Sequence, residues 1–406
     1  MRDDVPLARA LVFSHTNQLT RLREATPAAL PVAHVAGDPC FDRILASRTF
    51  RRRYRHALGV GDRTLVLLST TWSRKSTIGV RFDLVRSLLA ELPRDEYAVA
   101  IVVHPNVTHR HGVSQVGLWF ADCLRAGLIV LDEIDGWRPG LIAADVVIGD
   151  NGSVTGYAAA LGTPTLLAAF PDVPPHTAIS ELGAAAGRLP AHGPYRAVID
   201  EARADDATDR FARVAALMTS EPRRSLTLLR DIFYRILELP VPDSEVRDSI
   251  LPAPVSRPVP DTFADIVSVT VEAAVIRIRR RPAEIQTRAN FPTWHLCCAT
   301  DYPIRSLREN AAVLVGRSGD TGGDFVRWSR TQLLHNPLAV VVATETARGC
   351  VAMTREGVAV QVTGCPAEIA ASMLYAWRET NSDHWPGTHE VVVGNVGYEM
   401  DVERLS

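Results

Sequence analysis

The fold is decided by residues 145–170, DVVIGDNGSVTGYAAALGTPTLLAAF. An apolar run at 145–150 leads into a tight loop of small residues, helical spacing follows at 152–161, and a second apolar run occupies 163–170. Short β-branched runs without polar alternation are typical of strands buried on both faces, as in parallel sheets. Strand, loop, helix and strand in this order therefore predict one βαβ unit of a parallel sheet covered by helices.

The same alternation extends outward from this unit over the first 240 residues. Apolar runs predict further strands at 10–15, 64–70, 97–105 and 127–131. Helical spacing predicts helices at 39–58, 80–92, 112–125, 176–187, about 205–218 and about 222–237. The predicted fold class of this part is therefore α/β, a Rossmann-like domain with a parallel sheet.

A proline-rich segment at 240–261 divides the chain. Its six prolines and weak apolar periodicity are typical of a stiff, partly extended linker, so we place the main domain boundary there. Strand-like runs follow at 268–279, 294–300, 338–345, 350–354, 358–363 and 391–400, with a hairpin turn at 355–357 and helical spacing at 302–312, 324–335 and 367–379. Residues 262–406 are therefore predicted to form a smaller α+β domain of unknown role. We interpret the basic run at 277–281 as a strand end that enters solvent, with an anionic partner as the alternative.

The composition limits the possible partners and locations. The 406 residues include 44 Lys and Arg against 46 Asp and Glu, a formal net charge of −2. Such a chain has no global basic field to hold nucleic acid or an anionic membrane, so we expect no nucleic-acid partner. No signal-like opening and no apolar run near the ~20 residues that span a bilayer are visible, which predicts no transmembrane segment.

Cysteine and histidine spacing predicts neither disulfides nor a metal site. The six cysteines show no CxxC pair, and a chain of this length does not need disulfides, so a cytoplasmic location is expected. His109 and His111 lie near His104 without clustered carboxylates or thiolates. Cys297 and Cys298 are adjacent in a predicted strand and should point to opposite faces. We predict no metal and no other cofactor.

Polar clusters follow four of the predicted strands. They occupy 70–76 (TTWSRKS), 104–106 (HPN), 150–155 (DNGSVT) and 171–172 (PD). In an open parallel sheet, ligands bind in the crevice beyond the carboxyl ends of the strands. We therefore expect a ligand-binding site at this edge of the sheet.

The turn Gly149-Asp150-Asn151-Gly152-Ser153 has the composition of a phosphate-binding loop. Small residues before a helix let backbone N–H groups approach an anion, the helix dipole favours negative charge, and the serine adds a hydroxyl. The alternative is structural: Asn151 or Ser153 caps the helix and glycine relieves a tight turn.

Three further residue types at the strand ends also have two interpretations. The His104 imidazole could donate a hydrogen bond to a diphosphate leaving group, or it could be a structural histidine under a loop. Arg74 and Lys75 could neutralise phosphate charge, or they could form a solvated loop tip. Trp72 is interpreted as a packing aromatic rather than as a platform for base stacking.

Taken in order, these loops resemble the C-terminal, donor-binding half of the CDP-glycerol glycerophosphotransferase family. The resemblance rests on 70–74 (TTWSR), 104–105 (HP), 149–154 (GDNGSV) and 170–172 (FPD), and it spans about residues 35–240. That family builds teichoic-acid-type polymers on a GT-B scaffold. A weaker similarity to UDP-N-acetylglucosamine 2-epimerases rests on 149–154. The resemblance implies that 35–239 form a nucleotide-binding, GT-B C-terminal-half-like domain and that 1–34 are the remnant strand and helix of a preceding domain.

The resemblance also implies roles for individual residues. His104 and Asp150 would be the catalytic residues, with His104 contacting the donor diphosphate as the cytidylate leaves. The donor and its phosphates would be bound by the remaining matched positions, Thr71, Arg74, Gly149, Asn151, Gly152, Ser153 and Asp172. Gly152 departs from the family pattern, which has serine there. No counterpart of the family's His-Gly-rich loop appears, so the catalytic base is not identified, and His15 is a poor substitute for it.

The function implied is that of a glycerophosphotransferase-like or glycosyltransferase-like protein. It would bind a nucleotide-diphosphate donor, either CDP-glycerol or a nucleotide sugar, and transfer the glycerophosphate or glycosyl group to an acceptor hydroxyl. The acceptor side would come from the C-terminal domain or from a second chain. One alternative is a non-catalytic nucleotide-binding or scaffold protein derived from a GT-B half. Another is an epimerase-like enzyme acting on a sugar nucleotide.

Overall fold

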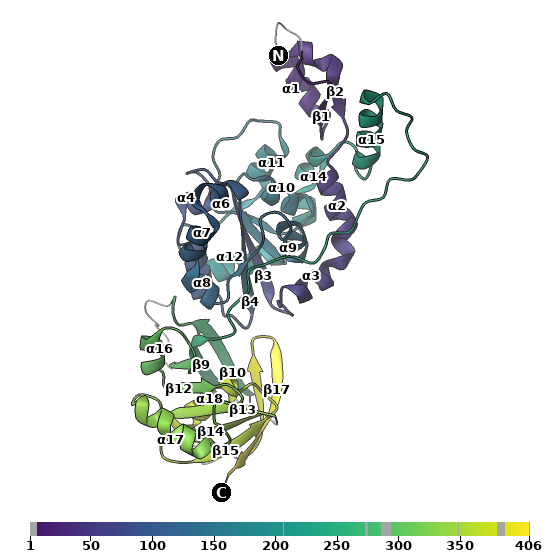
Figure 1. Cartoon of the computed structure of the whole chain (residues 1–406). Helices are drawn as coiled ribbons and strands as arrows, with labels where there is room; N and C mark the ends of the chain where they lie inside the picture. The colour runs from purple at the N-terminus through teal and green to yellow at the C-terminus, as the bar shows by residue number, and fades with distance from the viewer. Residues whose placement is uncertain are drawn as a thin grey trace. The chain divides into compact units, whose positions relative to one another are not determined.

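A computed structural model of the chain (Figure 1) describes residues 6–205, 207–272, 275–285, 294–347, 349–379 and 386–405. Contacts between residues divide the chain into two compact units. The first consists of the residues up to Leu84 together with Ala100–Val116 and Ile129–Arg257, and the second consists of Val85–Val99, Gly117–Leu128 and the residues from Pro258 onward. Each unit has its own hydrophobic core.

A six-stranded sheet runs in the order β5-β4-β3-β6-β7-β8. Its strands are β3 (Thr64–Thr70), β4 (Tyr97–Val103), β5 (Ile129–Val130), β6 (Val146–Gly149), β7 (Thr165–Leu167) and β8 (Gly187–Arg188). The pairs β3–β6, β4–β5, β6–β7 and β7–β8 are parallel, which confirms the predicted parallel sheet. Every residue of β3 and β4 is buried, as expected for strands covered on both faces.

Helices alternate with these strands along the chain. They are α2 (Pro39–Ser47), α3 (Arg51–Ala57), α4 (Thr77–Val80), α5 (Leu84–Glu91), α6 (Pro105–His111), α7 (Val113–Trp119), α8 (Ala121–Arg125), α9 (Trp137–Ala143), α10 (Ser153–Ala160), α11 (Ala178–Ala185), α12 (Tyr195–Ala204), α13 (Ala207–Arg210), α14 (Ala212–Met218) and α15 (Ser225–Ile236). The α10 helix confirms the helix predicted at 152–161. The helix predicted at 39–58 is interrupted by a 3-10 turn, η2 (Arg48–Phe50), and α9 and α12 were not predicted.

The N-terminal segment forms a small sheet of its own. Strand β1 (Leu11–Phe13) pairs in parallel with β2 (Ala33–Val35), and α1 (Asn17–Ala25) and the 3-10 turn η1 (Pro27–Val32) lie between them in the chain. The α1 helix has no buried residue. The predicted strand at 10–15 therefore exists, but it lies outside the six-stranded sheet.

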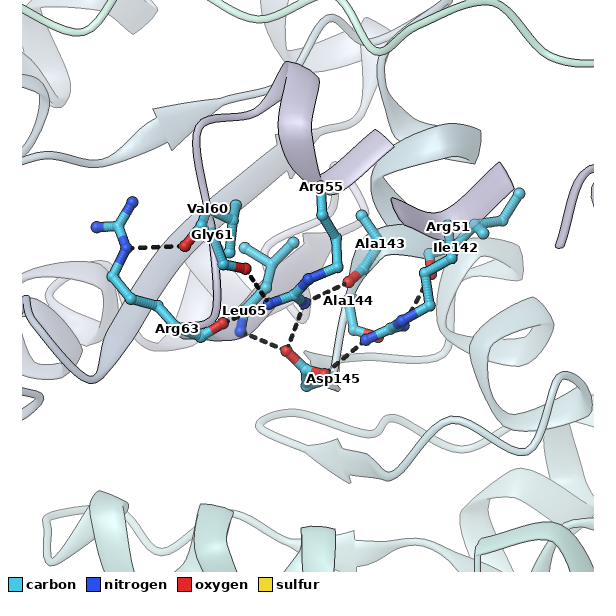
Figure 2. A network of polar contacts seen from close by, with 10 residues as sticks. All are labelled: Arg51, Arg55, Val60, Gly61, Arg63, Leu65, Ile142, Ala143, Ala144 and Asp145. Atoms are coloured by element: carbon cyan, nitrogen blue, oxygen red, sulfur yellow. Dashed lines mark hydrogen bonds and ion pairs between the residues drawn. The ribbon is translucent and has the colours of Figure 1, made fainter. Parts of the chain in front are cut away.

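Two arginines of α3 and one aspartate close the amino end of the central strands (Figure 2). Asp145, directly before β6, pairs with Arg51 at 2.5 Å and Arg55 at 2.8 Å, and it accepts a hydrogen bond from the Leu65 N–H at 2.7 Å. Both arginines also donate to carbonyls of residues 142–144 at the C-terminal end of α9, where a helix favours positive charge. These contacts tie α3, α9, β3 and β6 into one scaffold.

The second unit contains a closed barrel of nine strands in the order β10-β16-β17-β15-β14-β13-β12-β11-β9. The strands are β9 (Ala264–Glu272), β10 (Val275–Pro282), β11 (His295–Ala299), β12 (Val313–Gly316), β13 (Val341–Thr346), β14 (Gly349–Thr354), β15 (Ala359–Thr363), β16 (Gly387–Val393) and β17 (Val396–Arg404). The pairs β10–β16, β11–β12 and β12–β13 are parallel, and the other pairs are antiparallel. The sequence predicted an α+β domain with some antiparallel sheet, but it did not predict closure.

One helix, α18 (Ala367–Glu379), packs into a single core cluster with residues from all nine strands. Consecutive residues Ile369 to Leu374 are at most 1% exposed, so this helix is enclosed on every side. The short helices α16 (Arg305–Glu309) and α17 (Phe325–His335) belong to a separate cluster. Cys297 lies in the first cluster and Cys298 in the second, which confirms that these neighbours point to opposite faces.

Three predictions for the second unit were wrong in detail. The runs at 268–279 and 391–400 are not single strands, because each contains parts of two antiparallel neighbours, β9–β10 and β16–β17. The basic run at 277–281 does not simply enter solvent. The Arg280 side chain is only 17% exposed, and it pairs with Asp95 at 2.6 Å and with Glu368 at 2.9 Å.

Other features can be stated for the described residues alone. No helix among them is long and apolar enough to cross a membrane. Residues 237–263 form neither helix nor strand apart from an isolated bridge at Ser256, in the region predicted as a linker. In the described ranges, no three His, Cys, Asp or Glu side chains gather in a way that could hold a metal ion. The six cysteines are free thiols.

Candidate functional site

The turn between β6 and α10 is built around the buried carboxylate of Asp150, which is 0% exposed. One oxygen accepts hydrogen bonds from the Thr71 N–H at 2.9 Å, the Thr71 hydroxyl at 3.0 Å and the Thr77 N–H at 2.9 Å. The other oxygen accepts from the Gly152 N–H at 3.1 Å. The aspartate therefore joins the loop after β3 to the loop after β6, and it uses its hydrogen-bonding capacity to do so.

Two glycines of this turn are required by close packing. A Cβ at Gly149 would lie 2.2 Å from the Thr155 hydroxyl oxygen, and a Cβ at Gly152 would lie 2.9 Å from the Thr71 Cγ2. Contacts this short do not occur between real atoms, so a side chain at either position would displace its neighbour. The departure from serine at 152 is therefore explained by the Thr71 methyl group, which occupies the space that a serine side chain would need.

The N-terminus of α10 carries no side-chain cap, because its N-cap residue is Gly152. By contrast, α2 is capped by Asp38, and α11 is capped by a reciprocal pair between Thr177 and Ser180. Ser153, the first residue of α10, is exposed. Uncapped N–H groups and the helix dipole together make such an end attractive to an anion.

A cavity of about 330 Å³ lies against the start of α10. Its lining comes from four parts of the first unit, namely Ser14, His15, Asn17, Gln18, Arg21 and Asp38; Ser153 and Tyr157; His176, Thr177, Ala178 and Ile179; and Leu217 and Met218. The first residues of α1, α10 and α11 all line it, so three helix N-termini meet there. Together with the Arg21 guanidinium, they make this part of the cavity favourable to negative charge.

The ring nitrogens of His15 have distinct roles. Its Nδ1 accepts a hydrogen bond from the Asn17 N–H at 3.1 Å. An imidazole that accepts at Nδ1 carries its proton at Nε2, so His15 can present an N–H donor. A donor of this kind at the cavity wall suits an anion.

The opposite polarity occurs at Asp38, where a carboxylate and a phenol form a pair. The Tyr157 hydroxyl donates to Asp38 Oδ2 at 2.7 Å. Burial, and next to it the neighbouring Asp38 carboxyl, raises the pKa of Tyr157 well above its usual range. The phenol therefore stays protonated at neutral pH and remains a donor to Asp38.

The structure brings some of the predicted site residues together. Thr71, Asp150 and Gly152 form one hydrogen-bonded group, with Ser153 next to it in the chain. Of the predicted site residues, Ser153 alone is found in the lining of this cavity, as far as the described part of the chain extends. Asn151 is half-buried between the two, and Gly149 ends β6.

His104, Arg74 and Asp172 lie apart from the lining of the cavity. His104 is the N-cap of α6, and its Nδ1 accepts from the Asn106 N–H at 3.1 Å. Arg74 and Asp172 are exposed loop residues. The bond at His104 is the structural role that the sequence left open, although it also places the imidazole proton on Nε2, where it can be donated.

Sequence reasoning missed most of the cavity wall. His15 lies two residues beyond β1, so the strand-end argument that selected His104 applies to it equally. Tyr157 is four residues beyond Ser153 and therefore lies on the same face of α10. For Asp38 the only signal was an N-cap pattern, an aspartate directly before proline and the helix at 39–47.

Comparison with known proteins gives limited information. No family model matches the chain, and no curated protein matches it. Among solved structures, the wall teichoic acid polymerase TagF is similar at 14% identity and a TM-score of 0.41, over 57% of this chain and 58% of that chain. Anabaena Alr3699/HepE in complex with UDP and glucose is similar at 16% identity and a TM-score of 0.33, over 57% of this chain and 64% of that chain.

A third similar structure is UDP-GlcNAc 2-epimerase from Neisseria meningitidis bound to UDP-GlcNAc, at 13% identity and a TM-score of 0.34, over 56% of this chain and 62% of that chain. The chain thus spans less than two thirds of the length of each of these three proteins. At such identities and scores, the likenesses assign neither a family nor an activity to this chain.

Proposed function

We propose that this protein binds a nucleotide-diphosphate donor, CDP-glycerol or a nucleotide sugar, with the diphosphate at the N-terminus of α10. The observation that carries the proposal is the uncapped start of α10, where Ser153 lines a cavity of about 330 Å³. The choice of donor follows the resemblance of the strand-end loops to the glycerophosphotransferase family.

The electrostatics of the cavity support an anionic ligand. First-turn N–H groups of α10, the Ser153 hydroxyl and the His15 Nε2–H are donors without a fixed negative partner of their own among the contacts given above. Such donors are strongest where they are held in place before the ligand arrives. Asp150 provides this preorganisation, because it fixes the turn through four hydrogen bonds.

The transfer itself would follow the chemistry of an in-line displacement. In the glycerophosphate case, an acceptor hydroxyl oxygen would bond to the glycerol-bearing phosphorus as the bond to CMP breaks. The hydroxyl proton would pass to a base that stays unassigned, and the donors at α10 would stabilise charge on the phosphoryl oxygens. An acceptor-binding part on a second chain stays a prediction.

The test is calorimetric titration with CDP, CDP-glycerol, UDP and UDP-glucose. We expect saturable binding of at least one pair, and we expect Ser153→Glu to weaken it by about tenfold or more, because its carboxylate occupies the anion position. Glutamate at a first-turn position favours the helix, so the fold should be kept. Val113→Glu, at the exposed first residue of α7, is the matched control. Absence of binding across all four nucleotides would contradict the proposal.

The second candidate function is non-catalytic nucleotide binding. It is favoured by the hydrogen bonds of the two residues predicted to be catalytic, since the Asp150 carboxylate is buried among four donors and His104 caps α6. Release of CMP, or of UDP from a sugar nucleotide, with a polyol acceptor present separates the two functions. Tight binding without any release, even with an added partner chain, favours the binding protein.

A further inference from the structure

The cavity is electrostatically divided, and the division limits what can fill it. Ser153, His15 and the helix N-termini favour an anion at one part, while the Asp38 carboxylate lies in the lining elsewhere. Two like charges in contact in a partly desolvated site repel each other, so a phosphate group does not fill the space beside Asp38. That space requires a group that donates a hydrogen bond.

The two parts lie a short distance apart on one helix. Ser153 and Tyr157 are separated by four residues, about 6 Å along the axis of an α-helix, and they share one face. The Tyr157 hydroxyl in turn holds Asp38 at 2.7 Å. A ligand that reaches both therefore has an anionic group and a hydrogen-bond donor only a few bonds apart.

The Asp38 carboxylate has one acceptor position left for such a donor. Its Oδ1 accepts from the N–H groups of Cys40 at 2.9 Å and Phe41 at 3.0 Å, and its Oδ2 accepts from Tyr157. A carboxylate offers about four acceptor positions, and within the described residues three are used. The fourth is on Oδ2, the oxygen that Tyr157 shares.

Asp38 and Tyr157 are both held rigidly. Gly37 adopts a positive φ of 76°, and a Cβ there would meet the Ser225 hydroxyl oxygen at 2.7 Å, so the residue before Asp38 is packed tightly. The Tyr157 ring stacks on Phe41 at 5.7 Å and on Trp137 at 6.0 Å between ring centroids. A polar pair fixed in this way can select ligands, because little order is lost when the ligand binds.

We propose that Asp38, oriented by Tyr157, accepts a hydrogen bond from a ligand hydroxyl, so that the cavity selects a polyol- or sugar-bearing phosphate over the bare anion. This inference rests on the proposed function, because it assumes that the anionic part of the ligand lies at α10. It adds a specificity-determining carboxylate and a positioning phenol to that site. Vicinal hydroxyls on glycerol or a hexose carry the chemistry that a carboxylate recognises.

The test compares each nucleotide with its hydroxyl-rich conjugate, CDP with CDP-glycerol and UDP with UDP-glucose, by calorimetry on the full chain. For the wild type, we expect a preference of about tenfold for the conjugate, as a hydrogen bond to a charged group provides. Asp38→Asn should abolish this preference and leave the affinity for the nucleotide alone within about twofold. Asparagine is an equally good N-cap, so α2 is kept, and thermal unfolding checks this.

Two further variants separate positioning from structure. Tyr157→Phe keeps the stacked ring and loses the hydroxyl, so we expect it to reduce the preference about threefold. Asp62→Asn removes the same charge at an exposed position of the first unit and should leave the preference unchanged. A uniform loss for nucleotide and conjugate in Asp38→Asn would mean a structural role and would overturn the inference.

A second set of probes distinguishes this inference from the proposed function. If no nucleotide binds, the proposed function fails, and sn-glycerol 3-phosphate against inorganic phosphate still tests the hydroxyl preference and its loss in Asp38→Asn. Equal binding of these two probes would overturn the inference. Phosphoethanolamine carries an ammonium in place of the hydroxyls, and binding tighter than that of glycerol 3-phosphate would identify an amine-binding site instead.

Discussion

The two ends of strand β6 each carry an aspartate, and the two are held in opposite ways. Asp145, directly before the strand, is paired with the guanidinium groups of Arg51 and Arg55 (Figure 2). Asp150, directly after the strand, is held by N–H and hydroxyl donors of Thr71, Thr77 and Gly152. The first is neutralised by two charges, and the second is buried with hydrogen bonds from neutral groups only among those contacts.

This difference separates a scaffold from a candidate binding site. At the amino end, the arginines also occupy the carbonyls that end α9, so donors and acceptors are matched. At the carboxyl end, the aspartate fixes a turn whose next element, α10, begins without a side-chain cap and borders a cavity. The unmatched donors are on the edge where ligands of open α/β sheets bind.

The largest effect is expected from Asp150→Ala. This change leaves the buried N–H groups of Thr71, Thr77 and Gly152 without their acceptor, and each unsatisfied group costs free energy. We expect the free energy of unfolding to fall by about 3 kcal/mol or more. Urea denaturation followed by circular dichroism measures it.

Asp150→Asn is the matched variant, because it keeps an oxygen acceptor and the side-chain volume. It should lose clearly less stability than the alanine variant, with the remaining loss caused by amide hydrogens facing N–H donors. Equal stability of the wild type and both variants would show that the Asp150 hydrogen bonds do not fix the turn.

A smaller effect is expected at the other end of the strand, from Arg55→Met. The Arg55 side chain is 15% exposed, and it donates to Asp145 and to the carbonyls of Ala143, Gly61 and Arg63. Removing it leaves those acceptors partly unpaired, so we expect a loss of about 2 kcal/mol in unfolding free energy. Nucleotide affinity should not change, because this network lies at the amino end of the strand.

Arg52→Met is the control for this variant. Arg52 is an exposed residue of the same helix, so its loss should change stability by less than about 0.5 kcal/mol. If Arg55→Met weakened nucleotide binding as strongly as Ser153→Glu does, the separation of the two ends of β6 would be wrong.

The first unit could be predicted well because its signals are local. Buried strands such as 64–70 and 97–103 are continuous apolar runs, and the helix at 153–160 lies between glycine-containing turns. The α9 helix was missed because WRPGLIA contains proline and glycine, which usually end helices. Its C-terminal carbonyls instead receive hydrogen bonds from Arg51 and Arg55, residues about 90 positions earlier in the chain.

The closed barrel of the second unit could not be predicted from periodicity. Closure depends on the parallel pairing of β10 with β16, more than 100 residues apart, and on β15 pairing with β17 across the intervening α18. A pattern of alternating residues identifies strands, but it does not say which strands become neighbours. Continuous apolar stretches also concealed the two hairpins, which were interpreted as single long strands.

The candidate site was predicted in part for the same reason. The strand-end rule selected the turn at 149–153, and Ser153 does line the cavity. Asp38 and Tyr157 are 119 residues apart, and their pairing depends on how the N-terminal segment packs. A single sequence contains no signal for such a contact, so the carboxylate in the cavity wall became visible only in three dimensions.

The smallest effect tests the fit of the turn itself, through Gly152→Ala. The new Cβ would lie 2.9 Å from the Thr71 Cγ2, which should cost about 1 kcal/mol in unfolding free energy. Thr71→Ser removes that methyl group but keeps the hydroxyl that Asp150 accepts, so the double variant should recover most of the loss. A double-mutant cycle with a coupling energy of about 0.5 kcal/mol or more would support this, since contacting residues are coupled in this way. Additive effects would mean that the glycine is required for another reason, and that the missing serine at 152 is not explained by Thr71.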